Sequence, residues 1–317
     1  MSAEVVVCGE AMLLLLAEPG VPLEQAVSFR RSVAGAESNV AAGLARLGHS
    51  VRWLGRVGND PAGRSVLAQL RAHGIDTSCA VTDPDAPTGV ILRDSHPARA
   101  IDVQYLRAGS AASLMSPDEL DPGPLRGARL VHVTGITPML SDQARAATRR
   151  LIELARAEGS LTSFDPNIRH KLGSPDRWRE VVGPLLSAAD VVLAGEDELE
   201  LLGVTRPADL LESGPRTVVV KHGDKSATCL TRAGDSVRQP AFTVPVADPV
   251  GAGDAFAAGF LSGLLHGLDH AACLRQAAAV AALVVQSPTD TDGLPDRAGL
   301  DRALAALSGT GVETVVR

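Results

Sequence analysis

The residues best suited to chemistry lie in one short segment near the C-terminal end, Asp248-Pro249-Val250-Gly251-Ala252-Gly253-Asp254. A proline and two glycines interrupt regular structure there, whereas the alanine-rich run after Asp254 predicts a helix. A glycine loop that leads into a helix N-terminus binds anions, because its free N–H groups point outward and glycine lets a phosphate approach the backbone. Gly251, Ala252 and Gly253 would stabilise charge on a moving phosphoryl group. The carboxylate of Asp254 could accept the proton of an attacking hydroxyl.

A second segment near the N-terminus, Gly35-Ala36-Glu37-Ser38-Asn39, combines two small residues with an amide that can bind a polar ligand. The amide of Asn39 can both donate to and accept from sugar oxygens, and Gly35 and Ala36 leave room for a ring or an open chain. On its own, either segment could be only a turn that starts a helix.

Polar side chains also follow two predicted strands, where a parallel sheet places its ligands. Asn167 and Arg169 follow a strand at 161–164, and the segment 220–226 follows a strand at 217–221. We expect Asn167 and Arg169 to contact a ligand. The segment 220–226 could also be an ordinary tight turn with two solvated lysines.

The elements that must position these residues are strands and helices in alternation. Short apolar runs alternate with alanine-rich stretches, which is typical of an α/β fold with a mostly parallel sheet flanked by helices. We expect strands at 5–7, 51–57, 130–134, 161–164, 191–193 and 217–221, and helices at 37–47 and 61–73, both closed by glycine. Alternating apolar and polar residues at 88–107, together with the stretch 17–33, predict a small β-lid. Residues 1–16, 34–87 and 108–317 would form one large domain.

Composition and charge exclude several classes of protein. The 317 residues carry 30 basic and 37 acidic side chains, a net charge of −7, and so offer no footprint for nucleic acid or an anionic membrane. The longest apolar runs, 12–16 and 277–285, fall well short of the roughly 20 residues of a spanning helix, and Glu4 stands where a signal peptide is basic. The four cysteines form no C-x-x-C pair, which argues against disulfides and zinc sites. We therefore expect a cytoplasmic protein.

The two glycine-containing segments together resemble the two signatures of the ribokinase-like (PfkB) carbohydrate kinases, and the resemblance extends over essentially the whole chain. It implies a ribokinase-like fold with Asp254 as the catalytic base and the glycine loop as the anion hole. The sugar-binding residues that it implies are Gly35, Ala36, Asn39, Arg169, Asp254 and Asp290. The nucleotide-binding residues that it implies are Asn167, Lys221, Gly223, Lys225, Ser226, Gly251 and Gly253.

The same resemblance implies ATP as the phosphoryl donor and Mg²⁺ bridging its oxygens. Many relatives carry an Asn-x-x-Glu motif that organises magnesium; this chain keeps Glu198 but has Gly195 in place of the asparagine. Glu198 is therefore the magnesium candidate, while acidic residues at a helix start are also ordinary capping. A potassium ion beside the anion hole is a further implication, with Asp248 and the stretch 282–290 as its region.

Within this family the chain most resembles kinases of 2-keto-3-deoxygluconate, an acidic keto sugar. The matching pieces are Gly9-Glu10, 34–39, 105–111 and 134–138. Neutral-sugar relatives carry an aspartate in the first strand region, where this chain has Met12-Leu13-Leu14-Leu15-Leu16. Arg107 aligns with an arginine that relatives direct at the substrate carboxylate, which a guanidinium binds through two parallel hydrogen bonds. Tyr105 would lie on the same face of a strand.

The sequence thus predicts an ATP-dependent kinase that phosphorylates O6 of 2-keto-3-deoxygluconate. A fructokinase or other neutral-sugar kinase is the main alternative, and the leucine run and Arg107 argue against it. A sugar-binding regulator without activity is disfavoured because Asp254 and both loop glycines are present. A Rossmann dehydrogenase is weaker still, since no Gly-x-Gly-x-x-Gly follows the first strand. Lid edges of this kind often pair between subunits, so we expect a homo-oligomer.

Overall fold

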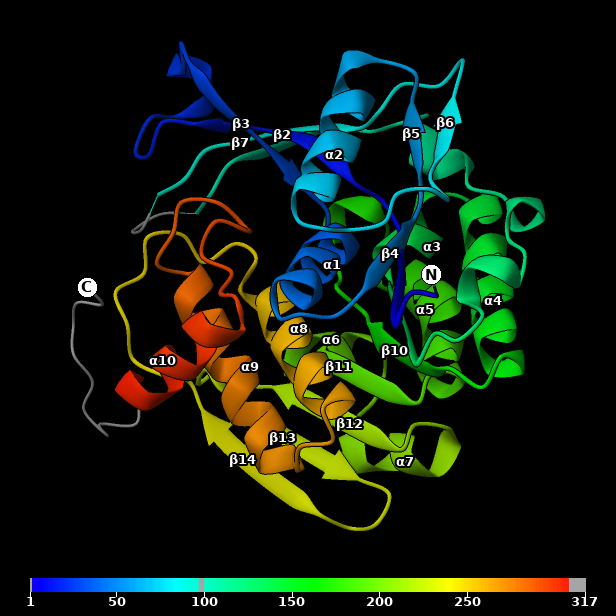
Figure 1. Ribbon diagram of the computed structural model, residues 1–317, viewed down its shortest axis with the longest axis vertical. Coiled ribbons are helices and arrows are strands. Elements are labelled where there is room, and N and C mark those ends of the chain that lie inside the picture. The colour runs from blue at the N-terminus through cyan, green and yellow to red at the C-terminus, as the bar shows by residue number, and fades with distance from the viewer. Residues whose placement is uncertain (1, 97–99, 308–317) are drawn as a thin grey trace.

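A mostly parallel sheet lies at the centre of the molecule (Figure 1). The computed structural model describes residues 2–96 and 100–307. Within these residues the sheet has eight strands, in the order β14-β13-β12-β11-β10-β9-β1-β4. Their bounds are β1 (Val5–Cys8), β4 (Val51–Leu54), β9 (Leu130–Thr134), β10 (Leu161–Asp165), β11 (Val191–Gly195), β12 (Thr217–Lys221), β13 (Ser226–Thr231) and β14 (Ser236–Pro240). The pairs from β4 to β12 are parallel and only the β13 and β14 pairings are antiparallel, which confirms the predicted α/β class.

Helices cover both faces of this sheet because its strands are apolar on both sides. One face carries α1 (Ala36–Arg46), α8 (Ala252–Leu265) and α9 (His270–Val284), and the other carries α4 (Asp142–Ala157) and α5 (Pro175–Ala188). The remaining helices are α2 (Pro61–Ala72), α3 (Ile136–Leu140), α6 (Glu196–Leu201), α7 (Leu210–Ser213) and α10 (Arg297–Leu307). Side chains alternate along β1, so Val5 and Val7 join the first core while Val6 and Cys8 join the second.

The two helices predicted at 37–47 and 61–73 are confirmed as α1 and α2. Asp60 caps α2 by accepting a hydrogen bond from the Gly63 amide, and Pro61 occupies the first turn. Each helix is followed by a glycine in the left-handed region, Gly48 with a φ of 98° and Gly74 with a φ of 83°. The glycine signal therefore located both helix ends.

A second sheet, with the order β3-β2-β7-β8, lies beyond the end of the central sheet, at the top of Figure 1. Its strands are β2 (Met12–Ala17), β3 (Phe29–Ala34), β7 (Val90–Arg93) and β8 (Val103–Leu106). Leu14, Leu16 and Ile91 form its own small core. β1 leads into β2 through residues 9–11, so the small sheet starts at the carboxyl end of β1. The alternation at 88–107 corresponds to the paired strands β7 and β8.

The boundary of this small sheet differs from the prediction. The sequence predicts that residues 12–16 belong to the large domain, whereas β2 pairs with β3 and β7. An unbroken apolar run lacks the alternation that distinguishes a half-buried strand from a central one. Of the stretch 17–33, only the part from Phe29 onward is paired as a full strand beside β2. The division of the chain into a large domain and a lid stays a prediction.

The predicted strand at 51–57 is two strands that separate at Gly55. β4 continues the central sheet, while β5 (Arg56–Gly58) pairs with β6 (Val81–Asp83) in a sheet of its own. A Cβ at position 55 would lie 2.1 Å from the Trp53 ring, so only glycine allows this change of direction. The antiparallel strands β13 and β14 were not predicted, because their polar and charged residues form no apolar run.

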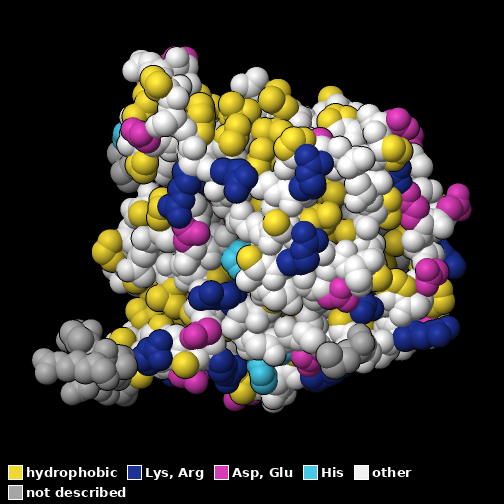
Figure 2. All heavy atoms as spheres, turned by 45° about the horizontal axis from the view of Figure 1, so that its top comes forward, with side chains coloured by type: hydrophobic (Ala, Val, Ile, Leu, Met, Phe, Trp, Pro, Cys, Tyr) yellow, Lys and Arg dark blue, Asp and Glu magenta, His cyan; other side chains and the backbone are white. Residues whose placement is uncertain are grey.

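The surface agrees with the composition. Figure 2 shows basic side chains interspersed with acidic ones, with no broad basic patch on the face that it presents. All four cysteines are free thiols, as expected. None of the helices in the described part of the chain is long and apolar enough to cross a membrane.

Candidate functional site

The loop that leads into α8 has the form that an anion site needs. Gly251 precedes the helix with a φ of 83°, in the left-handed region, and a Cβ there would lie 3.0 Å from Asp290. Outside its own helix and chain neighbours, a Cβ on Gly253 would meet nothing nearer than the Lys221 ammonium, at 3.9 Å. Ala252 begins the helix. The space beside Gly253 is therefore open and faces a cation.

Asp254 lies buried in the first turn of α8 between two asparagines. Its Oδ2 accepts a hydrogen bond from Asn39 Nδ2 at 2.9 Å, and its Oδ1 accepts one from Asn167 Nδ2 at 3.2 Å. Burial raises the pKa of Asp254 to about 6, although the Asn39 hydrogen bond and the charge of Arg169 act in the opposite direction. A carboxylate with this pKa is ionised near neutral pH and still basic enough to take a proton from a hydroxyl.

Two amide oxygens beside Asp254 are left for a ligand. Within the described structure, the buried Oδ1 atoms of Asn39 and Asn167 have no hydrogen-bond partner. Buried polar atoms are normally paired, so a hydroxyl that enters here can donate to them. Asn167 has a φ of 46°, a left-handed conformation that turns its amide from the end of β10 towards Asp254. The structure thus brings a predicted sugar residue and a predicted nucleotide residue to one carboxylate.

Lys221 stands at the carboxyl end of β12 beside two acidic groups. Its Nζ lies 2.9 Å from Asp165 Oδ2. Burial alone would lower the pKa of Lys221, but the charges of Asp165 and Glu198 raise it above its usual value, so the ammonium stays charged. Glu198 Oε1 accepts from the Ile168 amide and Oε2 from the Gly195 amide, both at 2.7 Å. Burial and the nearby Asp165 raise the pKa of Glu198.

A largely apolar pocket of about 560 Å³ opens beside the glycine loop. Five of the predicted site residues line it, namely Lys221, Lys225, Ser226, Ala252 and Gly253. Phe242, Phe256 and Val285 form part of its apolar wall. Gly223 is not among the lining residues, although it lies in the same β12–β13 turn. An apolar slot with lysines at one end has the character of a site for a flat base that carries phosphates.

Arg107 lies at the end of β8 and is already paired. Its Nη1 donates to Glu10 Oε2 at 2.5 Å, and its guanidinium carbon lies 4.3 Å from the centre of the Tyr105 ring. Gly35 contacts the same segment so closely that a Cβ would be 2.3 Å from the Glu10 carbonyl oxygen. The carbonyl oxygen of Gly35 also accepts a hydrogen bond from the Asn39 backbone amide. The cluster of Glu10 and Arg107 is therefore connected to the Asp254 site through the start of α1.

Glu10 was not predicted as a site residue. It is buried, its Oε1 has no hydrogen-bond partner in the described structure, and burial raises its pKa against the effect of the Arg107 charge. A glutamate in the short connection between β1 and β2 gives no signal of its partner, because Arg107 lies 97 positions away.

Arg93 is the second residue that sequence reasoning missed. It ends β7 with only 2% of its side chain exposed, and it pairs with Asp248 at 2.6 Å and Asp290 at 2.7 Å. A usable signal was present, because Arg93 has the same strand parity as the buried Ile91 and a buried arginine requires acidic partners. Asp290 is predicted to bind substrate. Its Oδ1 accepts a hydrogen bond from Arg93 Nη2, and its Oδ2 lies 3.4 Å from Asn39 Nδ2.

The donor atoms suit the two implied ions differently. No group of three acidic, histidine or cysteine side chains is arranged to hold a metal in residues 2–96 and 100–307. With both Glu198 oxygens on backbone amides, the site fits a magnesium ion held chiefly by nucleotide phosphates and water, as is common for this ion. Asp248 does not fit a potassium ion, because Arg93 engages its Oδ2 and the Val250 amide engages its Oδ1.

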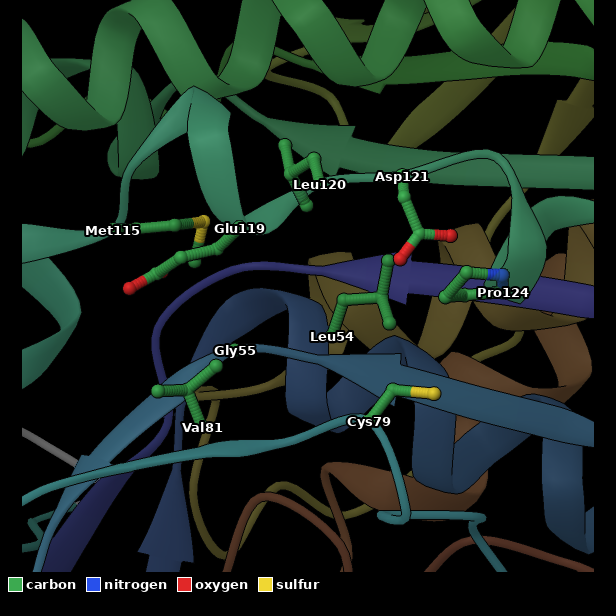
Figure 3. Close-up of a pocket in the computed structure, with 9 residues that line it drawn as sticks. All are labelled: Leu54, Gly55, Cys79, Val81, Met115, Glu119, Leu120, Asp121 and Pro124. Atoms are coloured by element: carbon green, nitrogen blue, oxygen red, sulfur yellow. The ribbon is translucent and has the colours of Figure 1, made fainter.

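A separate pocket of about 210 Å³ lies between the β5 region and the segment 115–124 (Figure 3). Leu54, Val81, Met115, Leu120 and Pro124 make its wall mostly apolar. It shares no residue with the set around Asp254, and its charged members, Glu119 and Asp121, are both acidic. It therefore offers nothing to an anionic ligand.

Comparisons with known proteins cover nearly the whole chain. A model described as pfkB family carbohydrate kinase matches residues 2–297. The 2-dehydro-3-deoxygluconokinase of Bacillus subtilis (strain 168) is 37% identical over 314 aligned positions, and the match covers 96% of this chain and 97% of that protein. The 2-dehydro-3-deoxygalactonokinase of Haloferax volcanii is 36% identical over 291 residues, 89% and 91% of the two chains. A solved PfkB protein from Polaromonas sp. JS666 has a TM-score of 0.86 and 40% identity over 95% of this chain and 99% of its own.

Proposed function

The chain belongs to the pfkB family of carbohydrate kinases, and we propose that it transfers the γ-phosphoryl group of ATP to O6 of 2-keto-3-deoxygluconate, also called 2-dehydro-3-deoxygluconate. The observation that carries the chemistry is the buried Asp254, which lies beside an open glycine loop at the N-terminus of α8. The name of the Bacillus subtilis relative and the Arg107 cluster support the choice of sugar.

The reaction needs a base and a place for negative charge. Asp254 takes the proton of the sugar hydroxyl while the oxygen of that hydroxyl forms a bond to the γ-phosphorus. The bond between this phosphorus and the ADP oxygen breaks at the same time. The amides at Gly251 to Gly253 and the N-terminus of α8 face the moving group and stabilise its charge. Lys221, held by Asp165, supplies a fixed positive charge beside Gly253. Bound magnesium would neutralise further charge on the phosphates.

The lid strands favour an acidic sugar. β2 has only Met, Leu and Ala side chains, so that strand has no carboxylate to accept hydrogen bonds from a neutral polyol. Arg107 gives one Nη to Glu10 and keeps further N–H donors for a substrate carboxylate. Tyr105 lies against the guanidinium and limits the directions in which it can point. Asn39 and Asn167 then bind the hydroxyl that is to be phosphorylated.

A coupled assay of ADP release tests the proposal. It compares 2-keto-3-deoxygluconate, its C4 epimer 2-keto-3-deoxygalactonate, and fructose, each with ATP and Mg²⁺. We expect kcat/KM for the two acidic sugars to exceed that for fructose by at least about tenfold, the size of one charge-assisted contact. A preference for fructose would make the chain a neutral-sugar kinase, and a preference for the galactonate would change only the epimer.

We also propose a cytoplasmic homo-oligomer. ATP is made in that compartment, and the four free thiols suit it. The lid carries exposed apolar side chains, with Val27 98% exposed and Leu106 53% exposed. Light scattering of the purified protein tests the association, and Leu106→Lys should weaken it.

A further inference from the structure

Three charged side chains are buried together behind the glycine loop. Arg93, Asp248 and Asp290 are each at most 5% exposed, and the guanidinium contacts one carboxylate with each of its Nη atoms. Buried charges are tolerated only when they are paired and hydrogen-bonded, so removing the arginine would leave two uncompensated carboxylates. The arginine comes from the lid strand β7, whereas both aspartates belong to the C-terminal part of the chain.

Each aspartate also holds a different part of the catalytic loop. Asp248 Oδ1 accepts the Val250 amide at 2.9 Å, at the start of the loop. Asp290 lies behind Gly251, where a Cβ would come within 3.0 Å of its backbone. Asp290 Oδ2 lies 3.4 Å from Asn39 Nδ2, and that nitrogen donates to Asp254 at 2.9 Å. Arg93 is thus connected to the glycine loop and, through Asp290 and Asn39, to the base.

We propose that Arg93 is a positioning residue for phosphoryl transfer, whose guanidinium acts as the fixed cation behind the glycine loop and makes a free monovalent cation unnecessary there. The proposal rests on the proposed kinase function. Arg93 does not touch the reacting atoms; it holds Asp248 and Asp290 in the positions that shape the loop. Because this cation is a side chain of the lid strand β7, the glycine loop has its cation only when β7 packs against Asp248 and Asp290.

The first test compares the wild-type enzyme in potassium and in tetramethylammonium buffers, with ATP, Mg²⁺ and 2-keto-3-deoxygluconate. We expect kcat to differ by less than about twofold, since the position is already filled by a guanidinium. Activation of the wild type by potassium of about tenfold or more, a difference of about 1.4 kcal/mol, would overturn the proposal.

The second test uses Arg93→Ala and Arg93→Lys. Misplacement of the loop should lower kcat of Arg93→Ala by about 10²-fold, with little change in KM for either substrate. Added guanidinium or potassium should restore part of that loss, and Arg93→Lys should keep more activity than Arg93→Ala because it keeps the charge. An Arg93→Ala enzyme with normal kcat, or a loss confined to KM, would contradict a positioning role.

Arg30→Ala is the matched control. Arg30 lies on β3 of the same sheet and also bridges to the C-terminal part of the chain, at 2.6 Å from Asp292, but it is 57% exposed. An exposed ion pair contributes little, so this variant should match the wild type in both buffers.

Thermal unfolding separates this proposal from the proposed function, because it needs no turnover. Potassium in place of tetramethylammonium should raise the Tm of Arg93→Ala by about 2 °C or more, by binding between the two carboxylates, and leave the wild-type Tm unchanged. If the wild type phosphorylates none of the sugars, but potassium raises the Tm of Arg93→Ala alone, the kinase assignment is refuted and the internal cation still stands. Equal potassium effects on both Tm values would refute the internal cation.

Discussion

The side-chain nitrogen of Asn39 and the carboxylate of Asp254, 215 positions apart in the chain, lie 2.9 Å apart. The contact joins the first turn of α1 to the first turn of α8, so two helix N-termini converge on the base. Both helix dipoles favour negative charge at this point. A sugar hydroxyl that donated to the free Oδ1 of Asn39 would therefore lie next to Asp254, as the proposed reaction requires.

Replacing the base should remove the chemistry and spare binding. Asp254→Asn keeps the shape of the side chain but cannot take a proton, so kcat should fall by about 10²- to 10⁴-fold. Calorimetry should find the affinities for ATP and for the sugar within a few-fold of the wild type. Near-normal turnover would remove Asp254 from the mechanism.

The pKa of Asp254 sets an acid limb in the pH profile. The group is active when ionised, so kcat/KM should be constant above its pKa and fall as the pH drops through about 6. Because the Asn39 hydrogen bond lowers this pKa, Asn39→Ala should move the limb to higher pH as well as weaken sugar binding. A limb that stays in place in Asn39→Ala would show that another group is titrating.

A side chain at Gly253 should block the nucleotide phosphates. Gly253→Val adds its methyl groups to open space in front of Lys221, so the protein should fold while ATP turnover collapses. Gly183→Val is the control, because Gly183 also lies in a helix and, apart from its chain neighbours, its Cβ would meet no atom within 4 Å; Pro184 follows it, so the change should cost some stability without reaching the site. Circular dichroism and turnover should be near normal for the control. An active Gly253→Val enzyme would show that the loop does not face the phosphates.

Arg107 should separate acidic from neutral sugars. Arg107→Ala should lose about 1.5–3 kcal/mol of binding to 2-keto-3-deoxygluconate, the range for a hydrogen bond to a charged group. Arg107→Lys should recover part of this loss, because an ammonium keeps the charge but not the planar fork. The measurement is kcat/KM for the acidic sugar and for fructose. Equal losses on both sugars would mean that Arg107 supports the lid through Glu10 instead of the substrate.

The residues that the sequence revealed are those whose chemistry is local. The loop could be recognised because the left-handed backbone at Gly251 and the close approach of Asp290 demand glycine there. Glu10 could not be assigned, because its partner Arg107 lies 97 positions away. The strand parity of Arg93 indicated that it is buried, but not that its partners lie 155 and 197 positions away. The leucine run of β2 was assigned to the large domain for the same reason: its partner strands β3 and β7, and not its own pattern, place it in the small sheet. Subunit association and cellular location stay predictions.

The first core has a consequence for how the protein is made. Val5, Val7 and Val40 leave the ribosome first, and they share one core with Phe260 and Ala277 of α8 and α9, which leave it among the last. During synthesis the nascent chain therefore carries an uncovered apolar face until residues 252–284 emerge, and such a face attracts chaperones and other unfinished chains. Chains that end before α8 lack both the lining of the phosphate loop and the cover of this core, so premature termination yields aggregation-prone fragments and never a partly active enzyme.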